Sequence, residues 1–378
     1  MSSAAALTLL TELLPTGVLP AMAASLHTTP SRIGFLASAF ATASTVAAIP
    51  LTTLALRLPR RALLLGLLAG LAVANTITAV SSSYPLTLLV RVAAGLVNGM
   101  LWSMLAGYAA RMVPAAQRGR AVAITLAGIT VTLAAGLPAA TALARWVGWR
   151  VTFALVAALA AVLVVWIRAT VPPIGGATTG GLVVSLMRTL RTPGVRIVLA
   201  TTCLLLAGHQ TLYTYISPFV AQAGIDHVSL VLLAFGAAAV AGIWVTGTVI
   251  DRHLRTAMLI AAGLFATTML TLGALATHHP AVMLGAVVAW GLAFGGIPTL
   301  LQTALIDAAG SGQADTATAM QTTVYNAAIA AGSLLGGIIL DHGSPAGLPW
   351  TPVALATAGL ATVATARHHG FPAKRQPM

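Results

Sequence analysis

The chain has 378 residues, of which 58% are hydrophobic and only 7% are charged, whereas about 25% of residues are charged in an average soluble domain. Long unbroken apolar runs exclude both a soluble globular protein and the alternating strands of a membrane barrel, and they predict an all-α membrane protein. The net charge of +13 comes from short clusters between apolar segments, which excludes a basic nucleic-acid-binding face.

Charges, prolines and Gly/Ser clusters divide the chain into twelve predicted spans of about the length that a membrane helix requires. They lie near residues 4–25, 32–56, 62–81, 85–110, 120–144, 150–169, 196–221, 228–250, 256–276, 280–305, 316–340 and 349–366. The polar interval 170–195 is predicted to be a cytoplasmic central loop. It separates two pseudo-symmetric six-helix bundles, residues 1–169 and 196–378, the second of which ends in a short basic tail.

The first predicted span carries Glu12, the only glutamate in the chain. An acidic residue at the centre of a membrane helix costs about 2.5–3.5 kcal/mol on insertion scales, so such residues are rare and usually functional. Pro15, Gly17 and Pro20 interrupt the same helix and free backbone groups that a protein-lined cavity can satisfy. We predict that this helix lines a pathway; the alternative is that Glu12 lies close to the cytoplasmic interface.

The fourth span carries Arg91 and Asn98. Arg91 is expensive in lipid, so it must face the protein interior, where it either bonds carbonyls at a helix break or influences the site around Glu12. Asn98, and Asn326 in the eleventh span, are polar residues at membrane depth that can line a cavity or bond between helices. We predict a cavity-lining role for both asparagines.

The seventh span carries His209 and Tyr213, which share one face of a helix. Together they offer a cavity hydrogen bonds and an aromatic surface, and a histidine can also join proton transfer near neutral pH. A lone helical histidine is equally compatible with packing. Since no acidic partners lie nearby in the sequence, we expect no metal site there.

An internal repeat supports the two-bundle division: RLPRRALLL follows the second span, and GTVIDRHLRTAMLI follows the second span of the other half. These loops, the TELLPTGVLP opening and the eleventh span with Asn326 resemble the major facilitator superfamily, and within it the bacterial drug/proton antiporter and sugar-efflux group. Arg91 and Gly95 stand as they do in the family's intramembrane arginine motif. The likeness covers essentially the whole chain.

The two loops resemble the family signature Gly-x-x-x-Asp-Arg-x-Gly-Arg-Arg. In the first copy Leu56 stands in place of the acid and Pro59 in place of the second glycine, and in the second copy Leu254 replaces that glycine. The resemblance implies a gating function for the matching residues, Arg57, Arg60, Arg61, Gly247, Asp251, Arg252 and Arg255. The fifth span resembles the antiporter motif through Gly128, Gly136 and Pro138, although Ala140 replaces a common glycine.

With both termini in the cytoplasm, fifteen of the nineteen basic residues fall on the cytoplasmic side. Three lie on the opposite side, and Arg91 lies within a span. The positive-inside rule therefore predicts this orientation, with the protein in the cell inner membrane.

The resemblance implies a secondary active transporter that exports a small organic solute of drug, sugar or nucleoside type by proton-coupled alternating access. Glu12 and Arg91 are then the proton-coupling residues, and Asn98, His209, Tyr213 and Asn326 line the substrate cavity. The partners are the solute, protons and membrane lipid, and we expect a monomer without cofactor. The alternatives are a facilitator or importer of sugars or nucleosides, and a degenerate homologue that does not transport. An intramembrane enzyme is disfavoured because no cluster of nucleophiles, acids or metal ligands is visible.

Overall fold

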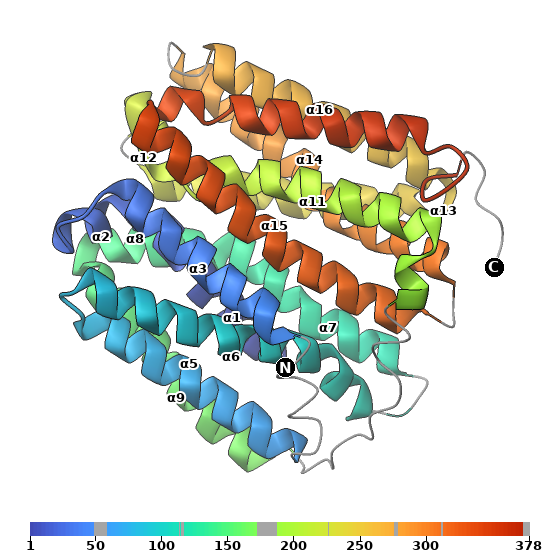
Figure 1. The fold of residues 1–378 in the computed structure, drawn as a ribbon. Helices are drawn as coiled ribbons and strands as arrows, with labels where there is room; N and C mark the ends of the chain where they lie inside the picture. Colours follow the sequence, from blue (N-terminus) through green and yellow to red (C-terminus); the bar gives the residue numbers. More distant parts are fainter. Residues whose placement is uncertain are drawn as a thin grey trace. The chain divides into compact units, whose positions relative to one another are not determined.

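The computed structural model describes residues 1–48, 59–112, 114, 117–171, 187–225, 227–275, 279–310 and 313–372. Every regular element within these ranges is a helix (Figure 1), which confirms the predicted all-α class. The chain divides into two compact units, Met1–Gly180 and Gly181–Met378.

The first unit contains eight α-helices and one π-helical segment within its described residues. They are α1 (Ser2–Gly17), α2 (Leu19–Ser25), α3 (Pro30–Ala48), α5 (Arg60–Val80), α6 (Tyr84–Arg111), α7 (Arg118–Val131), η2 (Thr132–Gly136), α8 (Leu137–Val147) and α9 (Trp149–Thr170). Helix α3 packs along α6, α5 packs along α9, and α1 packs against α7 and α6. In Figure 1, α9 lies behind α5, against which it packs.

The second unit contains six α-helices and one short 3₁₀ turn within its described residues. They are α11 (Pro193–Tyr213), α12 (Ile216–Gln222), α13 (Val228–Leu275), α14 (Pro280–Ala309), α15 (Ala314–His342), η3 (Pro345–Gly347) and α16 (Trp350–Thr365). Helix α13 consists of two helices joined at a kink, where His253 has φ −132° and ψ 35°. Helix α14 packs on α13, and α11 packs between α15 and α16 (Figure 1).

Nine helices in the described part of the chain are long and apolar enough to cross a membrane, or ten if the bent pair α1 and α2 is one span. Helix α13 contains two of the predicted spans, 228–250 and 256–276. Of the predicted span 32–56, the described part is the helix Pro30–Ala48. The count of twelve spans therefore stays a prediction.

The two units repeat the same broken helix at their start. Helix α1 gives way to α2 at Val18 (φ −116°, ψ 14°), and α11 gives way to α12 at Tyr215 (φ −111°, ψ 26°). After each seven-residue helix comes a residue with positive φ, His27 at 49° and Gly224 at 76°. Both pairs are 197 residues apart in the chain. The repeat predicted from the loops is therefore present in the backbone.

A second repeat joins the helix pairs α3/α6 and α13/α14 by close backbone contact. A Cβ atom on Gly95 of α6 would lie 2.2 Å from the carbonyl oxygen of Phe40 in α3, and one on Gly291 of α14 would lie 2.3 Å from that of Phe235 in α13. Any side chain at either position would push the helices apart, because real Cβ contacts are never so short. These glycines are 196 residues apart in the chain, so α6 and α14 are equivalent helices.

Candidate functional site

Pro15 leaves one carbonyl of α1 without a donor from the helix, and Arg91 bonds that carbonyl. Pro15 lies inside α1 and has no N–H, so it cannot donate to the carbonyl of Thr11 one turn earlier. Nη1 of Arg91 donates to that carbonyl at 2.9 Å, and Nη2 donates to the carbonyl of Glu12 at 3.2 Å. Of the two roles open to Arg91 from the sequence, the structure therefore shows the carbonyl-binding one directly.

Glu12 lies at the centre of a buried polar cluster that joins α1, α3 and α6. Its side chain is 8% exposed. Nδ2 of Asn98 lies 3.4 Å from the carboxylate oxygen Oε2 and 3.2 Å from Oγ of Ser44, which itself donates to the carbonyl of Gly95 at 2.9 Å. Glu12 is thus deep inside the first unit rather than at a solvent-exposed helix end.

Two further residues complete the surroundings of this cluster. The guanidinium carbon of Arg91 lies 4.4 Å from the ring centroid of Phe40, which gives a buried cation–π contact. Nδ2 of Asn75 in α5 donates to the hydroxyl of Thr11 at 3.0 Å. Sequence reasoning missed Ser44, Phe40 and Asn75. Asn75 alone carried a signal, as an amide inside the apolar run LLAGLAVANT.

Polar groups of α6 lie on both sides of Glu12. The amide of Asn98 lies beside its carboxyl group, and the guanidinium of Arg91 bonds its backbone carbonyl. Oδ1 of Asn98 and Nε of Arg91 are buried, and neither has a hydrogen-bond partner among the described residues. The cluster therefore still has one acceptor and one donor without partners among the described residues.

The structure places His209 and Tyr213 together in an aromatic cluster of the second unit. The ring centroid of His209 lies 3.6 Å from that of Phe294 with the rings nearly parallel, 4.9 Å from Tyr213, 5.2 Å from Trp290 and 5.8 Å from Phe235. Nε1 of Trp290 donates a hydrogen bond to Nδ1 of His209 at 3.1 Å. Sequence reasoning missed the three partners on α13 and α14, since nothing in span seven alone indicates which helices face it.

Asn326 is buried in α15, and its Nδ2 donates to the carbonyl of Thr322 one turn earlier, at 3.0 Å. Its cavity-lining role stays a prediction. Among the described residues, no group of three or more His, Cys, Asp or Glu side chains is placed to hold a metal ion.

In both units an arginine of the predicted gating motif caps the last helix. Arg61 donates to the carbonyl of Arg168 at the end of α9. Arg255 donates to the carbonyls of Val363, at 2.9 Å, and Phe371, at 2.7 Å, and its other nitrogen donates to that of Ala364 at 2.9 Å. The carbonyls of Arg168, Val363 and Ala364 are among those that a helix end leaves without partners, and Phe371 lies in the segment that follows α16.

The other gating-motif residues occupy varied positions. Arg60 is buried, whereas Gly247, Asp251 and Arg252 are exposed next to the kink in α13. Arg57 lies outside the described residues. The gating role of the motif stays a prediction.

The predicted antiporter motif joins the fifth span to the helix that carries Glu12. A Cβ atom on Gly128 would lie 2.2 Å from the carbonyl oxygen of Ser2 in α1, so α7 and α1 touch through their backbones. Gly136 ends the π-helical segment, and Pro138 is buried at the start of α8. The hydroxyl of Thr132 donates to the carbonyl of Ala6, 3.0 Å away. Single π-helical turns are frequent at functional sites.

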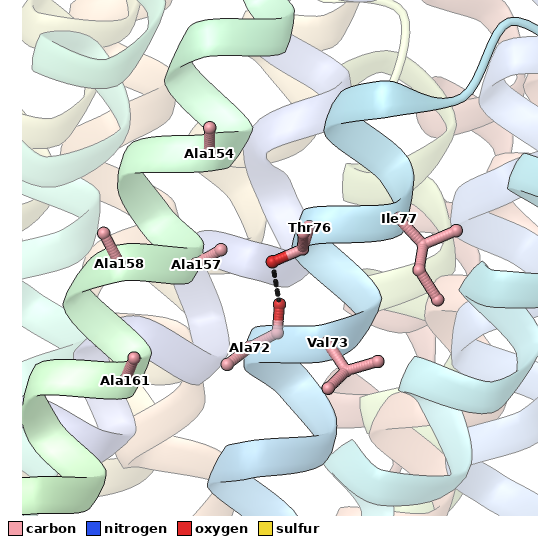
Figure 2. A pocket seen from close by; sticks show the side chains of 8 residues that line it. All are labelled: Ala72, Val73, Thr76, Ile77, Ala154, Ala157, Ala158 and Ala161. Carbon is pink, nitrogen blue, oxygen red and sulfur yellow. Dashed lines mark hydrogen bonds between the residues drawn. The ribbon is translucent and has the colours of Figure 1, made fainter.

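A separate surface hollow of about 430 Å³ lies between α5 and α9. Figure 2 shows its alkyl lining, which includes Val73, Ile77 and Ala157, and the bond from the Thr76 hydroxyl to the carbonyl of Ala72. The hollow is therefore lined almost entirely by alkyl groups.

Comparisons with known proteins agree with the helical architecture. The family model of the Major Facilitator Superfamily matches residues 1–333 and 226–371. The chain is 32% identical over 338 residues to a chloramphenicol resistance protein of Streptomyces lividans, covering 88% of this chain and 86% of that protein. It is 28% identical over 339 residues to a probable sugar efflux transporter of Mannheimia succiniciproducens, covering 88% of this chain and 84% of the relative.

Among solved structures, a crystal structure of a mutant form of the nucleoside transporter NupG has the same fold. The TM-score is 0.75 over 95% of this chain and 98% of that one, at 14% sequence identity. At this identity the likeness concerns the fold alone. Given the family model over nearly the whole chain and a relative at 32% identity, the protein is a multi-pass membrane transporter that belongs to the major facilitator superfamily.

Proposed function

We propose that the protein exports a small organic solute in exchange for protons, with Glu12 as the proton carrier. The observation that supports this most is the burial of the chain's only glutamate between a buried arginine and a buried asparagine. An acidic residue inside a membrane span raises the free energy of insertion by several kcal/mol, so residues of this kind are usually functional. The names of the relatives, chloramphenicol resistance protein and probable sugar efflux transporter, support export as the direction of transport.

In this mechanism Glu12 is exposed alternately to the two sides of the membrane. Protonation on the outside neutralises the carboxylate and removes its attraction for the Arg91 guanidinium and the Asn98 amide. Release of the proton on the inside restores both interactions. Arg91 remains bonded to the carbonyls of Thr11 and Glu12, so it holds the broken helix in place while the charge on Glu12 changes.

With Glu12 as the single proton carrier, one proton is exchanged for each transported molecule. Exchange of one proton for an uncharged solute moves one net charge, so it draws about 2.3 kcal/mol per 100 mV from the membrane potential in addition to the pH gradient. Exchange for a monocation is electrically silent. Membrane-potential dyes therefore report the charge of the solute once uptake is observed.

The test is uphill transport by purified protein in proteoliposomes, with radiolabelled chloramphenicol and arabinose as trial solutes. We expect at least one of them to accumulate against its gradient when the compartment that receives the solute is the acidic one. Accumulation should collapse when an uncoupler is added. Equilibration without accumulation, unchanged by the uncoupler, would show a facilitator instead, and accumulation in the opposite direction would show an importer.

The orientation has its own prediction, which depends on the distribution of basic residues. We expect reporter fusions at Lys374 and within residues 175–185 to be active as cytoplasmic fusions and inactive as periplasmic ones. A periplasmic signal from either position would contradict the proposed orientation and the even number of spans.

A further inference from the structure

The internal repeat places His209 at the position that Glu12 occupies in the first unit. Both residues lie six positions before the break in their helix, at Val18 and Tyr215, and they are 197 residues apart, like the breaks themselves. The helices that face them are equivalent too, because Gly95 of α6 and Gly291 of α14 make the same close backbone contact. The second unit therefore contains a copy of the Glu12 site with different chemistry.

The facing helices show how the chemistry changed. Helix α6 presents a stripe of six buried residues: Thr87, Arg91, Ala94, Asn98, Leu101 and Leu105. The equivalent residues of α14, each 196 positions later, are Met283, Val287, Trp290, Phe294, Ile297 and Leu301. Hence Arg91 is replaced by Val287 and Asn98 by Phe294. The copied site has lost its guanidinium and its amide.

His209 is held as a neutral residue in this copy. The indole N–H of Trp290 can only donate, so Nδ1 of His209, 3.1 Å away, must be the acceptor and cannot carry a proton. The single ring proton therefore lies on Nε2. One face of the imidazole is covered by Phe294 at 3.6 Å between ring centroids. His209 thus behaves as one more flat ring in the cluster rather than as a second proton carrier.

Phe294 is the member of the α14 stripe that is not fully buried. The other five residues of the stripe are buried, whereas Phe294 is half-buried. The exposed stripe of the same helix, Leu284, Val288 and Leu292, is the one that lipid would cover. Since each residue turns a helix by about 100°, Phe294 lies about 160° around the helix from Leu292, about 120° from Val288 and about 80° from Leu284. Its accessible surface therefore lies outside this exposed stripe.

Two unpartnered polar groups lie on the neighbouring helix α15. The hydroxyl of Tyr325 and Nε2 of Gln321, one turn earlier, are buried, and neither atom has a hydrogen-bond partner among the described residues. Tyr325 and Phe294 pack against the same small core of Leu206, Ala207 and Ala328. Hydrogen-bonding capacity is thus available near the half-buried ring of Phe294.

From these observations we infer that Phe294, backed by His209, is a stacking face for an uncharged planar ring of the transported solute, with Tyr325 and Gln321 available to bond its polar substituents. This inference rests on the proposed transport of a small organic solute but not on its coupling to protons. The first unit then carries the charged chemistry, and the aromatic copy in the second unit selects the solute.

Equilibrium binding to the purified protein, measured by isothermal titration calorimetry without any pH gradient, tests this inference. The probes are chloramphenicol, which is uncharged and carries an aromatic ring, and arabinose, whose ring is saturated. We expect Phe294→Leu to weaken chloramphenicol binding about tenfold, the upper range for one aromatic stacking contact, and Phe294→Tyr to restore it. The matched control is Phe153→Leu, a buried aromatic residue of the first unit that packs against Trp149.

Chloramphenicol binding that is unchanged in Phe294→Leu would overturn the inference, as would arabinose binding without saturable chloramphenicol binding by the wild type. Absence of binding by both probes would overturn it as well. Folding of each variant is checked by size-exclusion chromatography and by its melting temperature. If binding depends on Phe294 but no pH-driven transport is found, the proposed coupling fails and the stacking site stands.

Discussion

Glu12→Gln is expected to abolish the accumulation of solute that an imposed pH gradient drives, while binding of the same solute stays near the wild-type value. The amide is nearly isosteric with the carboxyl group and can still bond Asn98, so the cluster of α1, α3 and α6 keeps its shape. It cannot release or take up a proton near neutral pH. The variant should therefore exchange solute downhill and lose only the coupled component.

The measurement compares wild type and Glu12→Gln in proteoliposomes with and without a pH difference of one to two units, which corresponds to about 1.4–2.7 kcal/mol per proton. Asp341→Asn is the matched control, because it removes a carboxylate from an exposed position at the end of α15. It should accumulate solute like the wild type. Undiminished uphill transport by Glu12→Gln would refute the assignment of the proton site.

The second large effect concerns Arg91, which supplies the hydrogen bond that Pro15 removes from α1. Arg91→Met keeps much of the side-chain volume but leaves the carbonyl of Thr11 without either donor. Loss of a hydrogen bond from a charged group costs about 1.5–3 kcal/mol, and relief of the buried charge offsets part of this. We expect a clearly lower apparent melting temperature and a loss of transport.

A double-mutant cycle identifies the cause of that loss. Pro15→Ala restores an N–H that can donate to the Thr11 carbonyl within the helix, so Arg91→Met should cost less stability in this background than in the wild type. Pro20→Ala is the control, because Pro20 stands in the first turn of α2, where a missing N–H breaks no helical bond. An equal loss of stability on Arg91→Met in the Pro15→Ala and the Pro20→Ala background would contradict the explanation that Arg91 stabilises α1 by bonding the Thr11 carbonyl.

The sequence was sufficient for the fold class and for the residues at the centre of the first site, and the physical reasons are local. Glu12, Arg91 and Asn98 are each conspicuous as polar groups in apolar spans, and Pro15 and Gly17 predicted a break that the structure shows as a bend of 68° between α1 and α2. Membrane burial makes such groups costly wherever they stand, so no knowledge of neighbouring helices was needed.

The partners of these groups could not be predicted, because they depend on which helix faces meet. Ser44 and Phe40 are ordinary residues of a membrane span until α3 is known to pack on α6. Trp290 and Phe294 likewise read as generic apolar residues of the tenth span. Hydropathy indicates that a helix face is buried but not which helix covers it. Both the aromatic cluster and the neutral state of His209 depend on how α11 packs against α13 and α14.

The repeated glycine contacts have a consequence for how this protein can diverge. Gly95 and Gly291 set the spacing of their helix pairs through close contact with the carbonyls of Phe40 and Phe235, so this spacing does not depend on the side chain of Phe294. In the stacking role that we infer for Phe294, a mutation there alters which compounds are recognised and leaves the proposed proton coupling unchanged. Laboratory selection for a new substrate should therefore yield substitutions in α14 and few in α1. The range of recognised compounds then changes, while the driving force of transport stays the same.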